Sequence, residues 1–123
     1  MARRSQPSQP QPPAPALRVP RAEAAEKIQA QINEGEALLA QQPRSEPELA
    51  GFRERRRIWS DYNRELLVQL FTSTAVADEY SAFVPGAFSM QPSFAQLVEY
   101  WRDSVQSSLT RLRSIYRRLE LFP

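Results

Sequence analysis

The sequence predicts an all-α fold, an antiparallel three-helix bundle with a short extra helix and a disordered, proline-rich N-terminal tail. Apolar residues recur at spacings of three and four over three long segments, which is the α-helical period. No segment alternates between apolar and polar residues as a half-buried strand would. Most prolines stand in the first 20 residues and in the connections between the periodic segments.

The N-terminal segment, residues 1–20, carries six of the 11 prolines, separated mainly by Gln and Ser. Such a segment buries too little apolar surface to offset the entropy of ordering it, so we expect a disordered tail. The remainder, residues 21–123, is long enough for one modest core and is predicted to form a single helical bundle.

The first predicted helix, residues 22–41, consists largely of strong helix formers and carries apolar residues at Ile28, Ile32 and Leu39. Gly35 completes this stripe, although glycine costs about 1 kcal/mol relative to alanine inside a helix. It marks either a close approach of another helix or a tolerated weak point.

The second predicted helix spans residues 46–71. Ser45 stands where its hydroxyl can cap the amide of Glu48, and Glu48 can reach back toward Ser45. Pro47 falls in the first turn, where its missing N–H costs nothing. These residues predict a well-defined helix start.

A short amphipathic helix, residues 75–83, follows, and the last helix spans residues 94–121. Ser93 and Gln96 have the spacing of a capping box at its start. The first helix is shorter than the other two long helices and covers only part of the groove between them. The bundle is therefore expected to complete its core with a second copy or with another domain.

The helical stripes predict a core made of Ile28, Ile32, Leu39, Phe52, Trp59, Tyr62, Leu66, Leu70, Val76, Tyr80, Leu97, Trp101, Val105, Leu112, Tyr116 and Leu119. Trp59 and Trp101 lie in the middle of the two longest helices and are predicted to be principal packing residues. Aromatic side chains can instead stack on nucleic-acid bases. Because nearly all the aromatics fall on the apolar stripes, burial in the core is the favoured interpretation.

The residue types needed for several chemistries are absent. The chain has no Cys and no His, which excludes disulfides, the usual zinc and iron–sulfur ligand sets, and His-based triads. Its three glycines form no phosphate-binding loop. The carboxylate pairs, Asp78 with Glu79 and Asp61 with Glu65, have no supporting third group in their segments. We therefore expect no catalysis, no cofactor and no bound metal.

Two groups of arginines stand out, at residues 53–57 and 111–118, and the alternative function is nucleic-acid binding through both groups. A nucleic-acid module usually has a basic excess on the domain itself. Here all 14 acidic residues lie at Glu23 or later, so the helical part carries no positive excess. Acidic residues also stand three or four positions from the arginines, which is typical of a solvated helix surface.

Arg53, Arg56 and Arg57 are the candidate contacts for the acidic surface of a protein partner. The predicted loop at residues 84–91 adds Phe88 and Met90, which either cover the end of the bundle or contact a partner. No apolar run reaches 18 residues and no signal sequence is evident, so we expect no membrane association and a cytoplasmic location.

The run IWSDYNRELLVQLFTSTAVADEY, residues 58–80, joins a helix to a polar break and an acidic-aromatic pair. Its pattern consists of Trp59, Asn63, Leu66, Leu67, Leu70, Phe71, Glu79 and Tyr80. It resembles the helical module that precedes effector domains, such as TIR-like or nucleotide-binding domains, in predicted prokaryotic defence proteins. INEGEALL and RLRSIYRRLELFP are also similar to that module, so the resemblance spans residues 22–123.

This resemblance implies oligomerisation, partner docking or regulation of an attached or separately encoded effector. No TIR-like or nuclease sequence follows Pro123, so it implies a module without its effector domain, either a stand-alone adaptor or part of a longer protein. Together with the composition, it predicts a non-enzymatic helical interaction module that forms a homodimer or binds another protein.

Overall fold

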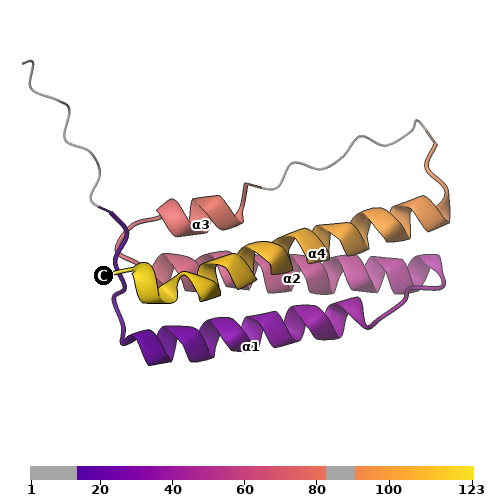
Figure 1. The fold of residues 1–123 in the computed structure, drawn as a ribbon. Coiled ribbons are helices and arrows are strands. Elements are labelled where there is room, and N and C mark those ends of the chain that lie inside the picture. Colours follow the sequence, from indigo (N-terminus) through magenta and orange to yellow (C-terminus); the bar gives the residue numbers. More distant parts are fainter. Residues whose placement is uncertain (1–13, 83–90) are drawn as a thin grey trace, which may run out of the picture.

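In the part of the chain that the structure describes, the fold consists of four α-helices and one turn of 3₁₀ helix (Figure 1). The computed structural model describes residues 14–82 and 91–123. The elements are α1 (Arg21–Leu39), α2 (Glu46–Leu70), α3 (Ala75–Tyr80), α4 (Phe94–Arg117) and the 3₁₀ helix η1 (Leu119–Leu121). The predicted all-α class is confirmed, since these ranges contain no strand and only an isolated bridge. No helix within them is long and apolar enough to cross a membrane.

Serine caps fix the starts of α2 and α4, as the sequence predicts. Ser45 Oγ accepts a hydrogen bond from the amide of Glu48 at 3.2 Å. At α4 both halves of the capping box are present: Ser93 Oγ accepts from the Gln96 amide, and Gln96 Oε1 accepts from the Ser93 amide at 2.8 Å. Each cap satisfies amides that the first helical turn leaves without a partner, and contributes about 1 kcal/mol.

The three long helices lie side by side, with α1 antiparallel to both α2 and α4 (Figure 1). α2 and α4 run parallel to each other, and α3, which lies between them in the chain, runs in the opposite direction (Figure 1). The predicted antiparallel arrangement of neighbours is therefore wrong for this pair. α3 packs against both α2 and α4, and α1 packs against the same two helices.

Most of the predicted core is buried: Ile28, Ile32, Phe52, Trp59, Leu66, Leu70, Val76, Tyr80, Val105, Leu112 and Leu119. Leu39, Leu97 and Trp101 are partly buried. Tyr62 and Tyr116 are corrections, since 55% and 38% of their surfaces are exposed. The buried face of α2 passes through Asn63 and that of α4 through Ile115, in each case the neighbour of the predicted tyrosine.

Gly35 marks a close helix contact, one of the two roles that the sequence allowed. A Cβ atom at this position would lie 2.5 Å from Leu109 Cδ2 and 2.5 Å from Trp59 Cζ2. Both neighbours are buried, at 0% and 4% exposure. The missing side chain therefore lets α1 approach α2 and α4 at the middle of the bundle.

Residues 14–20 lie against the bundle rather than in the expected tail. The Leu17 amide donates to the Pro123 carbonyl at 3.0 Å, and the Arg18 amide donates to the Leu70 carbonyl at 2.8 Å. Leu17 and Val19 pack against the core. The proline-rich composition predicts a tail, but these two apolar residues hold residues 14–20 against the bundle. The segment lies at the end of the bundle where the C-terminus also lies (Figure 1).

Candidate protein-interaction surfaces

Two of the three candidate arginines stack on one tryptophan. The guanidinium carbon of Arg53 lies 4.5 Å, and that of Arg56 5.0 Å, from the centroid of the Trp101 ring. Nη1 of Arg56 also donates to Ser104 Oγ at 3.3 Å. Within residues 14–82 and 91–123, neither arginine forms an ion pair with a carboxylate. Each stacking contact contributes about 0.5–1 kcal/mol at an exposed position.

A shallow cavity of about 250 Å³ opens beside these arginines. It is lined by Ala50, Arg53, Glu54, Arg56, Arg57 and Trp101. Three of the six lining residues are cationic and one is anionic, so the cavity has a net positive lining. We name the surface formed by Arg53, Arg56 and Trp101 the arginine–tryptophan site.

Arg57 differs from its two neighbours because it already has carboxylate partners. Its guanidinium binds both oxygens of Glu54, at 2.6 and 3.1 Å, and Asp61 at 3.2 Å. The hydrogen bond from Arg57 lowers the pKa of Glu54, and the same bond raises the pKa of Arg57. These groups lie in solvent, so they form the solvated helix surface that the spacing of charges predicts.

The second arginine group takes part in contacts within the bundle. Arg113 forms an ion pair with Glu36 of α1 at 3.5 Å, and Arg118 forms one with Glu79 of α3. Arg111 donates to the carbonyl of Ala82. These arginines lie toward the C-terminal end of α4, whereas Trp101 lies near its N-terminal end. The structure therefore does not bring the two predicted arginine groups together.

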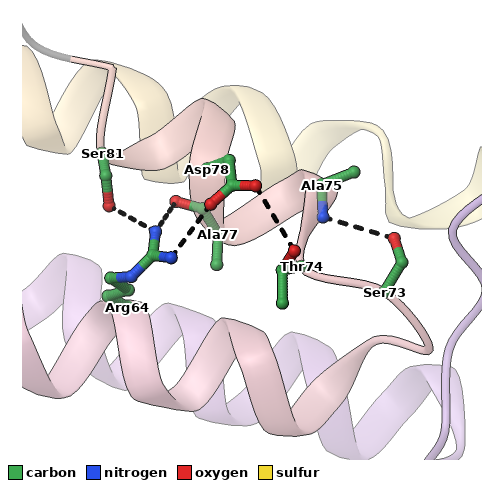
Figure 2. Close-up of polar contacts among 7 residues, drawn as sticks. All are labelled: Arg64, Ser73, Thr74, Ala75, Ala77, Asp78 and Ser81. Atoms are coloured by element: carbon green, nitrogen blue, oxygen red, sulfur yellow. Dashed lines mark hydrogen bonds and ion pairs between the residues drawn. The ribbon is translucent and has the colours of Figure 1, made fainter.

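A polar cluster joins α2 to α3 (Figure 2). Arg64 donates to the Ala77 carbonyl and to Ser81 Oγ, each at 2.9 Å, and binds Asp78 at 2.9 Å. The Asp78 carboxylate also accepts a hydrogen bond from Thr74. One carboxylate of the candidate Asp78–Glu79 pair is thus held by Arg64 and the other by Arg118.

The residues on which the defence-module resemblance rests are mostly internal. Asn63 is fully buried, and its Nδ2 donates to the Tyr80 hydroxyl at 3.0 Å. Tyr80 in turn donates to Ser60 Oγ. The other buried members are Trp59, Leu66, Leu67, Leu70 and Phe71. This pattern therefore packs α2 against its neighbours and does not form a surface site.

An open apolar groove lies between α1 and α2. Its volume is about 630 Å³, and it is lined by Gln31, Glu34, Ala37, Leu38, Gln41, Arg55, Ile58, Trp59 and Tyr62. Ile58 and Tyr62, one turn apart on α2, expose 56% and 55% of their surfaces. We call this surface the α1–α2 groove. Large exposed apolar side chains beside a groove are typical of a binding surface.

The apolar stripes in the sequence do not predict the α1–α2 groove. Ile58 lies outside the stripe of α2, and that stripe places Tyr62 in the core. The width of the apolar pattern on α2 could have indicated the groove, because Ile58 and Tyr62 make the apolar face of this helix wider than one core covers.

Phe88 and Met90, the other candidate contacts, lie outside the described residues. Among those that are described, no three acidic residues cluster as metal ligands would.

The chain matches no family model, no curated protein and no solved structure.

Proposed function

We propose that the chain is a non-enzymatic helical interaction module that forms a homodimer through the α1–α2 groove. The observation that supports this function is the pair of exposed apolar side chains, Ile58 and Tyr62, on the wall of an apolar groove. Full burial of one large apolar side chain contributes about 1.5–3 kcal/mol. A dimer buries two copies of each, and tyrosine is enriched in protein interfaces.

The antiparallel packing of α1 and α2 suits a two-fold interface. A two-fold axis parallel to these helices sets α1 of one copy over α2 of the second copy, with the two helices antiparallel. The four helices then form an antiparallel bundle, with Ile58 and Tyr62 of each copy in the groove of the other. This arrangement completes the core that the short first helix leaves partly uncovered.

In this arrangement the charged residues of the groove on one copy face residues of opposite charge on the second copy. Glu34 of α1 and Arg55 of α2 line the same groove. No ion pair joins them within one copy, and the Arg55 guanidinium donates to Gln41. The two-fold axis places Glu34 opposite Arg55 of the second copy, twice in each dimer. Such pairs contribute little energy but select the register of the interface.

We propose that dimerisation regulates an effector, as the resemblance to the defence module implies, and that the module acts in the cytoplasm. Pairing two modules brings two attached or separately encoded effectors close together. The alternative function, nucleic-acid binding through both arginine groups, has less support. One group is engaged by acidic side chains of α1 and α3, and Arg57 of the other is held by Glu54 and Asp61.

Sedimentation velocity over a wide range of protein concentration tests the homodimer. We expect the sedimenting mass to rise with concentration from 14.1 kDa toward twice that value. Ile58→Glu places a charge in the dry interface and should leave a monomer across the same range. Gln106→Glu, an exposed change of the same charge on α4 and outside the groove, should dimerise normally. A wild-type chain that stays monomeric at every concentration would remove this proposal.

A further inference from the structure

We infer that the arginine–tryptophan site binds the carboxylates of an acidic segment of a protein partner. This site goes beyond the homodimer and uses different residues. Arg53 and Arg56 lie on the side of α2 that faces Trp101 of α4, whereas Ile58 and Tyr62 line the groove beside α1. The buried stripe through Trp59 separates the two surfaces on α2.

The stacking geometry prepares both guanidiniums for carboxylates. A guanidinium above an aromatic ring uses its face for the ring and keeps the N–H groups at its edge for acceptors. Stacking also restricts a side chain that is otherwise flexible, so less conformational entropy is lost when an acceptor binds. Arg53 and Arg56 are three positions apart on one helix, which spaces their Cβ atoms by about 5–6 Å. A segment with two carboxylates one helical turn apart matches this spacing.

The partly buried guanidinium of Arg56 has no carboxylate partner among the described residues. The side chain is partly buried, its Nε is inaccessible to solvent, and this Nε has no acceptor among the described residues. Among the described residues, its one hydrogen bond goes to the neutral hydroxyl of Ser104. A partly desolvated cation without a carboxylate is electrostatically unfavourable. An incoming carboxylate at the cavity would supply the missing negative charge.

An acidic protein segment fits the site better than nucleic acid does. The Trp101 ring already carries two guanidiniums, so it is not open as a platform for base stacking. The cationic surface is short, because Glu54 and Asp61 hold the adjacent Arg57. A phosphate backbone needs several contacts along its length to bind tightly. Two carboxylates need only the two arginines.

Fluorescence anisotropy with three labelled probes tests the inference on the full chain. The first probe is an alanine-based helical peptide with glutamates at positions i and i+4. The second is the same peptide with glutamines, and the third is a single-stranded oligonucleotide of similar length. We expect the glutamate peptide to bind most tightly, with an affinity that falls as salt rises. Arg53→Gln and Arg56→Gln should each weaken its binding by about tenfold or more.

Arg117→Gln is the matched control, because Arg117 is exposed at the other end of α4 and the charge change is the same. It should leave binding unchanged. Arg53→Gln keeps the test decisive if Arg56→Gln fails to fold, since Arg53 is exposed. The experiment is repeated with Ile58→Glu, whose monomer should bind the peptide as the wild type does, so failure of the dimer is distinguished from failure of this site.

Three results would overturn the inference. The first is equal binding of the glutamate and glutamine peptides, because carboxylates would then have no role. The second is binding by the folded Arg53→Gln chain that equals binding by the Arg117→Gln chain. The third is tighter binding of the oligonucleotide than of the glutamate peptide, which would assign the surface to nucleic acid instead.

Discussion

Replacement of Gly35 by leucine is expected to lower the free energy of unfolding by about 3 kcal/mol. Even the Cβ atom would lie 2.5 Å from both Leu109 and the Trp59 ring, so these two buried neighbours would have to shift within the core. Gly35→Ala should cost less, since overpacking by about 1–3 kcal/mol is partly offset by about 1 kcal/mol of helix propensity. Denaturant unfolding followed by circular dichroism measures both losses.

Gly51→Ala is the matched control for Gly35. A Cβ atom at position 51 would meet only the end of the Arg55 side chain, at 3.5 Å. Alanine should therefore raise the free energy of unfolding by about 0.5–1 kcal/mol, as in an open helix. All chains are compared at one concentration, because dimerisation makes stability depend on it. If Gly35→Ala stabilised the chain as much as Gly51→Ala does, the close packing of α1 described here would be incorrect.

The second large effect is expected at Trp59. Trp59→Ala should lower the free energy of unfolding by about 3–5 kcal/mol, because it empties the volume of a side chain that is 4% exposed. It also removes the hydrogen bond from Nε1 to the Gln31 carbonyl, at 2.9 Å. Denaturant unfolding measures the loss, and the near-ultraviolet circular dichroism band of the buried indole should disappear with it.

Trp101→Ala provides the comparison for Trp59. The Trp101 ring is only partly buried, and of the two arginines on its surface Arg53 is exposed and Arg56 is partly buried. Its removal should cost about 1–2 kcal/mol, which is less than the cost of removing Trp59. The sequence predicts that both tryptophans are principal packing residues. Equal losses in the two variants would contradict the difference in burial that the structure shows between them.

Local signals in the sequence predict the helices well, because each depends on neighbouring residues. The capping serines Ser45 and Ser93 place the starts of α2 and α4 at the residues where the structure has them. The periodic stripes also identify most of the core. These features need only the geometry of a single helix, so they can be obtained without knowing how the helices pack.

The exact buried faces of α2 and α4 could not be predicted from the apolar stripes alone. Asn63 is fully buried with its amide bonded to Tyr80, while Tyr62 beside it is exposed. A stripe drawn through apolar residues alone includes Tyr62 and omits Asn63, so it assigns the wrong face of α2 to the core. In α4, the choice of Tyr116 over Ile115 follows from repeated steps of four in a helix of 3.6 residues per turn.

The candidate surfaces depend on contacts between distant parts of the chain, which periodicity does not reveal. The sequence singled out Arg53 and Arg56, but not Trp101 of α4 as the residue on which they stack. It also gave no reason to pair Glu34 with Arg55 across a groove. Likewise, the parallel direction of α2 and α4 depends on where α3 packs, and no local residue pattern specifies that.

Mixing two single variants tests the two-fold interface most directly. In a homodimer of the Glu34→Arg chain two positive charges face each other across the axis, and in a homodimer of the Arg55→Glu chain two negative charges do. Both chains should therefore dimerise more weakly than the wild type. Mixed together, the first variant presents two arginines and the second presents two glutamates, so every facing pair becomes attractive. Sedimentation equilibrium of the mixture should therefore show a heterodimer that is tighter than either homodimer.

A matched mixture separates this effect from attraction between oppositely charged chains. Glu65→Arg and Arg117→Glu make the same net changes of charge at exposed positions outside the groove, and their mixture should show no preference for the heterodimer. Heterodimer formation is expected only for the Glu34→Arg and Arg55→Glu pair. A mixture of that pair that sediments as two independent chains would contradict dimerisation through the α1–α2 groove.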